Sequence, residues 1–287
     1  MFRKYNKLNL QKGILLAILL LLGGCSASFT YNNIGWLSGF WIDDYVDLNK
    51  QQSKTVKALI KDTRDWHRET QLPLYKQDLI HFQTLLAGSP TEQALLTHFN
   101  NAKEHWQIFV NKIAEPLIRV AKTLNTQQRQ QFIESISKNM LEEQQEFTDQ
   151  TSVERSEARL EEQLDTYEDW IGKLSQSQVA LITVANNEHI STFSLWQRYK
   201  QARLDALSNI FNNSLLTDSE FNQQMAHVIK ERQAFMSAEL IDTEQQNLAR
   251  YVKLLVDLKG TLTTNQLDHA DKKFSEMIED IDDLLKD

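Results

Sequence analysis

The sequence of 287 residues has few of the residues that break regular structure, with eight glycines and three prolines. Three of the glycines, Gly13, Gly23 and Gly24, lie in the first 24 residues, which leaves five for the rest of the chain. A β-sandwich or a multi-stranded α/β fold needs many turns, so this scarcity argues against both. Glutamine occurs 26 times and, with Glu, Leu, Lys and Ala, gives a helix-forming composition. We therefore predict an all-α fold, a bundle of long helices with no sheet.

The sequence also lacks the common motifs of catalysis and metal binding. Its single cysteine excludes an intramolecular disulfide and a cysteine-rich metal site. None of the seven histidines forms the metalloprotease pattern, and there is no phosphate-binding loop, dinucleotide glycine motif or serine nucleophile elbow. His98 and His105 would lie about 10 Å apart along a helix, too far for one metal ion. We therefore expect no metal, no cofactor and no enzymatic activity.

The N-terminus carries the strongest single signal. Residues 1–12 hold four cations and no acid, and an apolar run of about ten residues follows, too short to cross a hydrocarbon core of about 30 Å. This pattern predicts a secretory signal peptide over residues 1–24. The run ends in Leu22-Gly23-Gly24-Cys25, which resembles the lipobox of bacterial lipoproteins. The resemblance implies that Cys25 becomes the mature N-terminus and carries acyl chains, which give stable anchoring when there are several.

The residue after the cysteine and the overall charge bear on location and partners. Ser26 stands where an aspartate would favour retention in the inner membrane, so the lipoprotein resemblance implies the outer membrane, facing the periplasm. Loss of residues 1–24 removes four cations and no acid, which changes the net charge from −8 to −12. The charge is uneven, near +2 over residues 25–140 and −14 over residues 141–287. Nucleic acid is therefore a poor partner for this chain.

The mature chain divides into an aromatic-rich tether, residues 25–42, and a helical domain, residues 43–287, with two sub-bundles that could meet near 172–175. The tether contains Phe29, Tyr31, Trp36, Phe40 and Trp41. These side chains could lie among lipid headgroups, where Trp and Tyr are favoured. They could equally staple the N-terminus onto the helical body.

Capping signals and breakers predict the helices of the domain. We expect helices over residues 43–71, 73–87, 90–122 with a kink or a split at Pro116, 126–171, 218–259 and 264–285. The first begins with acids that suit a helix N-terminus and that could otherwise be read as a metal cluster, namely Asp43, Asp44 and Asp47. Capping boxes are expected at Ser89–Glu92, Asn125–Gln128, Ser175–Gln178, Thr217–Glu220 and Thr263–Gln266. An apolar seam on residues 264–285 predicts burial within the bundle.

A basic ridge lies on the helix that follows the tether. Its cations recur every three or four residues and fall within about 80° of one another on the helix surface. They are Lys50, Lys54, Lys57, Lys61, Arg64 and Arg68. The ridge could be solvated, could pair with the acidic segment 142–169, or could bind an anionic lipid surface or an acidic partner.

Two resemblances to known families supplement this interpretation. The start of the mature chain resembles a family of uncharacterised proteobacterial lipoproteins, which implies the anchor and the helical fold but no activity. The residues that carry this resemblance are Cys25, Tyr31-Asn32-Asn33, Trp36, Trp41, the run 43–48, Trp66-His67-Arg68 and Leu72-Pro73-Leu74-Tyr75. Separately, the runs 262–266 and 174–178 resemble the Leu-Thr-x-x-Gln motif of small periplasmic stress chaperones, although a capping box preceded by leucine explains the same residues.

Three functions follow as expectations. The first is a non-enzymatic lipoprotein, anchored in the outer membrane, that binds a protein or another envelope component in the periplasm. The second is a periplasmic holdase that protects unfolded clients. The third is an enzyme with a site near Trp66 and His67, where aromatic and ionisable groups adjoin.

Overall fold

The computed structural model describes residues 24–286, so residues 1–23 of the predicted signal peptide lie outside the described part. The described residues are 86% helical and form twelve α-helices, one 3-10 helix and no strand, which confirms the all-α prediction. In chain order the elements are α2 (Gly24–Asn32), α3 (Ile34–Asp43), α4 (Lys50–Thr70), α5 (Leu72–Ala87), α6 (Glu92–Thr123), α7 (Thr126–Thr148), α8 (Ser152–Ile171), α9 (Gln176–Glu188), α10 (Phe193–Asn212), α11 (Asp218–Lys230), η2 (Arg232–Phe235), α12 (Ala238–Lys259) and α13 (Thr264–Lys286).

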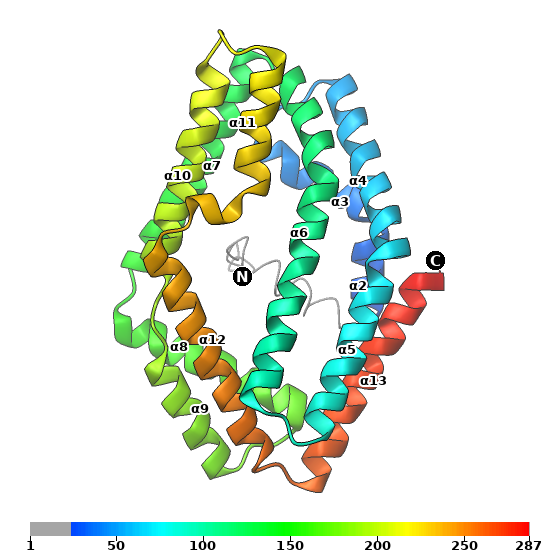
Figure 1. Ribbon diagram of the computed structural model, residues 1–287, viewed down its shortest axis with the longest axis vertical. Helices are drawn as coiled ribbons and strands as arrows, with labels where there is room; N and C mark the ends of the chain where they lie inside the picture. The colour runs from blue at the N-terminus through cyan, green and yellow to red at the C-terminus, as the bar shows by residue number, and fades with distance from the viewer. Residues whose placement is uncertain (1–23, 287) are drawn as a thin grey trace, which may run out of the picture.

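Helix α6 runs along the middle of an elongated frame and joins its two ends (Figure 1). At one end it packs against α4 and α11, and at the other against α5 and α12. Each end has its own apolar core. One core includes Ile118, Phe211 and Phe221, and the other includes Ile182 and Leu258.

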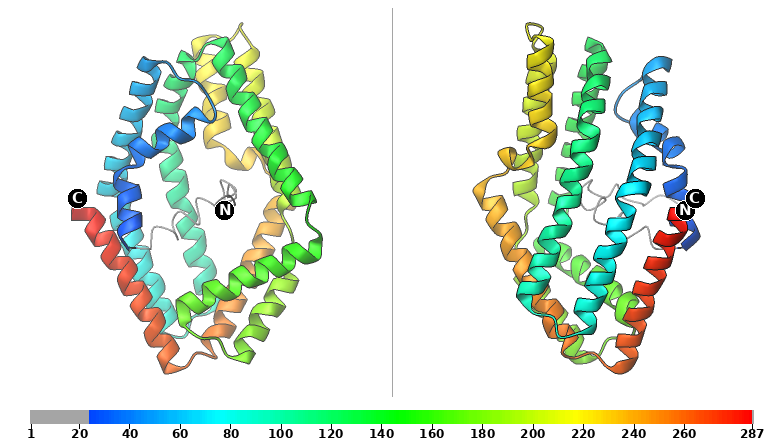
Figure 2. Two further views of the ribbon diagram at one scale, coloured as in Figure 1. Left: turned by 180° about the vertical axis from the view of Figure 1, so that it is seen from behind. Right: turned by 45° about the vertical axis from the view of Figure 1, so that its right-hand side comes forward.

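The segment expected to be a tether forms two helices that pack on the body. Helix α3 lies along α4, and α2 contacts α13 (Figure 2, left). Ile42 at the end of α3 packs against the core that contains Phe211. The N-terminal segment is therefore held to the body over both of its helices.

Several predicted boundaries were wrong because local caps were missed. Asp43 ends α3, and the next helix begins at Lys50 behind the N-cap of Asn49, so the acids at 43–47 are not its first turn. The N-cap of α6 is Thr91, not Ser89. Pro116 lies inside α6, which continues unbroken to Thr123.

The two longest predicted helices are also divided. The segment 126–171 forms α7 and α8, because a capping box of Thr151 with Glu154 starts a new helix. The segment 218–259 forms α11, η2 and α12, and Ser237 caps the last of these. Polar residues that cap a helix also occur within helices, so composition alone did not reveal these breaks.

The other four predicted capping boxes are confirmed, and all four have the same pair of hydrogen bonds. In the boxes of Asn125, Ser175, Thr217 and Thr263, the small residue accepts from the N3 amide and the N3 side chain accepts in return. The missed caps at Asn49, with Gln52, and at Thr151, with Glu154, bring the boxes of this kind among the described residues to six.

Capping boxes whose N3 residue is glutamine are hydrogen-bonded to one another in pairs. Gln52 and Gln128 each donate an amide hydrogen to the other's carbonyl oxygen, at 3.0 and 2.7 Å. Gln178 and Gln266 do the same, at 2.9 and 3.0 Å. All four side chains are buried, and each pair joins two helix N-termini at one end of the frame.

The C-terminal helix buries its apolar seam within the molecule, as predicted. Phe274 and Leu284 of α13 are buried, and the helix packs against α5 and α8. Ion pairs add to these contacts, with Lys76 of α5 reaching Asp282 at 2.5 Å and Lys273 reaching Asp169 of α8 at 2.6 Å.

Candidate functional site

The structure divides the basic ridge into two parts. Lys50, Lys54 and Lys57 are exposed on the first half of α4, and no ion pair involving them occurs among the described residues. Lys61 is also exposed and pairs with Asp65 at 2.8 Å, one helical turn along. An exposed pair of this kind contributes less than about 1 kcal/mol, so this half of the ridge is available to a partner.

The second half of the ridge binds the N-terminal helix of the same chain. Arg64 donates to the backbone carbonyl of Asn32 at 2.8 Å, and Arg68 donates to the Asn32 side chain. The Arg68 guanidinium also lies 5.4 Å from the centre of the Tyr31 ring, a cation–π distance. These contacts, which sequence analysis did not foresee, hold α2 against α4.

A chain of polar aromatic groups completes the contact between α2 and α4. The Tyr31 hydroxyl lies 3.0 Å from Nδ1 of His67, and the Tyr75 hydroxyl lies 3.3 Å from Nε2. Burial and, to a smaller extent, the nearby His105 lower the pKa of His67 to about 4. Burial likewise raises the pKa of Tyr31 to about 12. His67 is therefore neutral at pH 7, and a neutral imidazole supplies the one donor and one acceptor that its two partners need.

Trp66 and His67, where an enzymatic site was considered, have partners within the body. Trp66 lies under the ammonium group of Lys112, 5.4 Å from its ring centre. His67 contacts the rings of Tyr75 and Phe109. These contacts indicate that His67 positions Tyr31 and, through Tyr31, helix α2.

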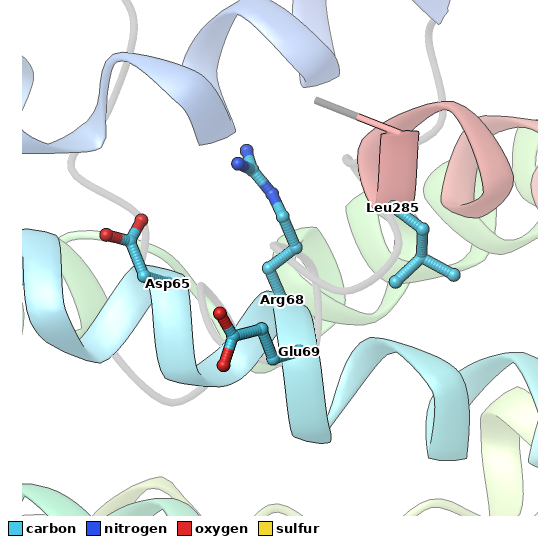
Figure 3. A pocket seen from close by; sticks show the side chains of 4 residues that line it. All are labelled: Asp65, Arg68, Glu69 and Leu285. Atoms are coloured by element: carbon cyan, nitrogen blue, oxygen red, sulfur yellow. The ribbon is translucent and has the colours of Figure 1, made fainter.

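A surface hollow lies beside the docked N-terminal helix (Figure 3). It is lined by Asp65, Arg68 and Glu69 of α4 and by Leu285 of α13. Arg68 points from α4 towards α2, away from Glu69 (Figure 3). The Arg68 guanidinium is bound to the Asn32 side chain, and the carboxylates of Asp65 and Glu69 would repel an anion. This hollow is therefore a poor site for an anionic ligand.

The acidic segment 142–169 does not meet the basic ridge in the described part of the chain. Glu143 pairs with Lys200, and Asp169 pairs with Lys273. The ridge instead contacts Asn32 and Asp65. Within residues 24–286, the ion pairs of the acidic segment are made with lysines outside the ridge.

The histidines and acids considered as metal ligands lie apart. His98 stacks on Phe82, and burial lowers its pKa. His105 instead pairs with Asp78. Over residues 24–286 there is no group of three or more His, Cys, Asp or Glu side chains arranged to hold a metal ion. None of the helices in this part of the chain is long and apolar enough to cross a membrane.

Comparison with known proteins places the chain in a family. A model described as "Family of unknown function (DUF6279)" matches residues 44–241, more than two thirds of the chain. The chain belongs to this family. The matched region of the DUF6279 protein begins just after α3 and includes the whole basic ridge, Trp66 and His67. No curated protein and no solved structure matches the chain.

Proposed function

We propose that this DUF6279 protein is a lipoprotein of the bacterial envelope, anchored through acyl chains on Cys25 in the outer membrane and facing the periplasm. The sequence Leu22-Gly23-Gly24-Cys25 after a short apolar run supports the anchor. The resemblance of residues 25–75 to proteobacterial lipoproteins supports the same location. The role that fits best is a binding or adaptor protein for an envelope component, without catalysis.

The observation that carries the binding role is the free half of the ridge. Lys50, Lys54 and Lys57 lie on one face of α4 within about two turns, exposed and without an ion-pair partner in the described residues. The same face positions α2 further along, through Arg64 and Arg68. A cationic surface on the helix that also holds α2 suits an acidic protein or another anionic envelope component.

The anchor is tested by metabolic labelling with a palmitate analogue. We expect label on the native protein, none on Cys25→Ala, and release of that variant from the membrane fraction. Ser26→Asp tests the sorting: the labelled protein should move to the inner-membrane fraction. A membrane-bound, unlabelled Cys25→Ala protein would contradict the anchor.

The binding role is tested by a photo-crosslinking amino acid in place of Lys57. One discrete protein adduct that is absent when the crosslinker replaces Thr55, an exposed residue on another face of α4, would support an adaptor. Many heterogeneous adducts would instead indicate the holdase. The holdase has less support, because the exposed apolar side chains of Leu141 on α7, Val153 on α8 and Leu215 in the turn between α10 and α11 are scattered singly.

A further inference from the structure

The chain leaves almost no spacer between the anchor and the body. Cys25 is the second residue of α2, and Asn32 of the same helix is bonded to Arg64 and Arg68 of α4. Seven residues of helix span about 10 Å. Acyl chains on Cys25 would therefore start about 10 Å from a point fixed to the body, where a flexible linker would have left the body free to rotate.

The surface next to this point is unusually aromatic. Phe29, Trp36 and Trp41 expose 59%, 62% and 53% of their surface. Among the described side chains, Tyr251 is the one other exposed aromatic, at 44%. Phe29 follows Cys25 by four residues, about one helical turn. Tryptophan is favoured at the membrane interface, because its ring is apolar and its N–H can reach water.

The contacts of α2 and α3 leave these aromatics facing outward. Tyr31 and Asn32 turn towards α4, and Phe29, two residues before Tyr31, projects to another side of the helix. In α3, Ser38 is buried, while Trp36 and Trp41 stay more than half exposed. Figure 2 shows both helices on the outer side of α4, with no other helix covering them.

Charges define the extent of this surface. Arg64 and Arg68 show that the ridge faces the side of α4 on which α2 lies, and Lys54 and Lys57 are exposed on the first half of the same ridge. Each lysine near an anionic membrane contributes about 1 kcal/mol. The membrane-facing surface ends at exposed acids, which an anionic membrane would repel. These acids are Asp43 and Asp44 at the end of α3 and Glu279 and Asp283 near the end of α13.

We propose that α2 and α3 form a membrane-contact surface, on which Phe29, Trp36 and Trp41 enter the lipid headgroup region and hold the protein in one orientation. The inference rests on the proposed anchor at Cys25. It adds that the body lies against the bilayer through this face, with the far side of the frame directed away from the lipid.

The test uses the mature chain, residues 25–287, which contains all of the described helices apart from Gly24. Its single thiol, Cys25, is coupled to a maleimide lipid in vesicles of phosphatidylethanolamine and phosphatidylglycerol with brominated acyl chains. Bromine quenches tryptophan fluorescence only at close range. Because the coupling is chemical, the result does not depend on whether cells lipidate Cys25.

We expect the fluorescence of the coupled native protein to be quenched in brominated vesicles. The double variant Trp36→Phe, Trp41→Phe should abolish this quenching, whereas Trp196→Phe, a change on α10, should preserve it. The two interfacial tryptophans are two of six, so the quenching should be partial and the other four should keep their emission. Both substitutions fall at half-exposed positions, and unchanged helical circular dichroism confirms the fold.

Coupled protein whose fluorescence is the same in brominated and ordinary vesicles would overturn the membrane-contact surface. So would quenching that survives in Trp36→Phe, Trp41→Phe. A discrete protein crosslinked from position 36 in cells, without quenching in vesicles, would show that the face binds a protein instead. Failure of palmitate labelling in cells would overturn the anchor alone.

Discussion

At the scale of the residue, the choice between glutamine and glutamate in a capping box follows its surroundings. Glu154 and Glu220 close boxes that face water, whereas the glutamines of the paired boxes are buried. A carboxylate serves a single box well, because it only needs to accept. In a pair, each N3 side chain must also donate across the junction, and only the amide can do this.

Gln178→Glu should therefore destabilise the protein by about 2 to 3 kcal/mol at pH 7. The new carboxylate would face the carbonyl oxygens of Gln266 and Thr261, to both of which the native amide donates. Chemical denaturation measures the change. The reverse substitution, Glu220→Gln, is the control and should cost less than about 0.5 kcal/mol, because that box is exposed. Equal effects at the two positions would refute the pairing rule.

His67 should make stability depend on pH. An unfolded histidine takes up its proton near pH 6.5, whereas burial keeps His67 neutral in the folded state down to about pH 4. Between these values the unfolded state binds the extra proton, so stability falls as the pH is lowered, by up to about 1.4 kcal/mol per pH unit. The partly buried His98, whose pKa is also lowered, acts in the same direction.

The comparison with His67→Gln isolates this contribution. Thermal midpoints measured from pH 7 to pH 4.5 should fall less steeply in this variant than in the native protein, whatever its stability at pH 7. His269→Gln, at an exposed position on α13, should keep the native slope. A native slope in His67→Gln would show that His67 is not buried as a neutral residue.

At the scale of the element, α2 depends on a few polar contacts rather than on a core. The residues of α2 belong to none of the three apolar clusters among the described residues. Arg68→Ala removes the bond to Asn32 and the cation over Tyr31, and hydrogen bonds of a charged group contribute about 1.5 to 3 kcal/mol. Amide hydrogen exchange of residues 26–33 should therefore accelerate about tenfold or more.

The rest of the molecule should hardly respond to Arg68→Ala, and its thermal midpoint should stay close to the native value. Lys57→Ala, which removes an exposed cation from the same ridge, should leave exchange in α2 unchanged. Unchanged exchange in Arg68→Ala would mean that other contacts hold α2. The same variant in brominated vesicles would also show whether the membrane-contact surface needs a docked α2.

The elements that sequence predicted best were those with a strong local signal. Gly88, Gly260 and the box at Asn125 have local chemistry that ends or starts a helix, and those boundaries were placed within a residue or two. Asn49 and Thr151 are also N-cap residues, but they lie within stretches of continuous helix-forming composition, so the sequence analysis missed the helix starts there. The resulting error at Asp43 shows that acids near a helix can belong to the end of the preceding one.

The candidate site was less predictable, because it depends on contacts between distant segments. Helical periodicity identified the ridge correctly as one face of α4. It gave no sign that Asn32, more than thirty residues earlier, would take up two of its cations. The signal available was the aromatic composition of the predicted tether, residues 25–42, which indicated either a lipid or a body contact. The structure shows the body contact of Tyr31 and Asn32, and it leaves Phe29 exposed on another side of α2.

At the scale of the whole molecule, α6 should make the two ends unfold together. It packs on α4 and α11 at one end and on α5 and α12 at the other, and α13 also bridges α5 and α8. The core with Ile118 includes α6 itself, whereas the other core includes Leu254 and Leu258 of α12, on which α6 packs. Because α6 is supported at both ends, we expect the loss of either core to destabilise the whole fold.

Calorimetry of single substitutions in each core tests this coupling. Ile182 is fully buried at one end, and Phe221 is 7% exposed at the other. Truncation of either residue to alanine should cost about 2 to 5 kcal/mol. Because α6 couples the ends, each variant should move one common transition to lower temperature. Val184→Ala is the control on the same helix as Ile182, and with 56% exposure it should change little. Two separate transitions, each responding to only one of the substitutions, would show instead that the frame is two independent bundles connected by a helix.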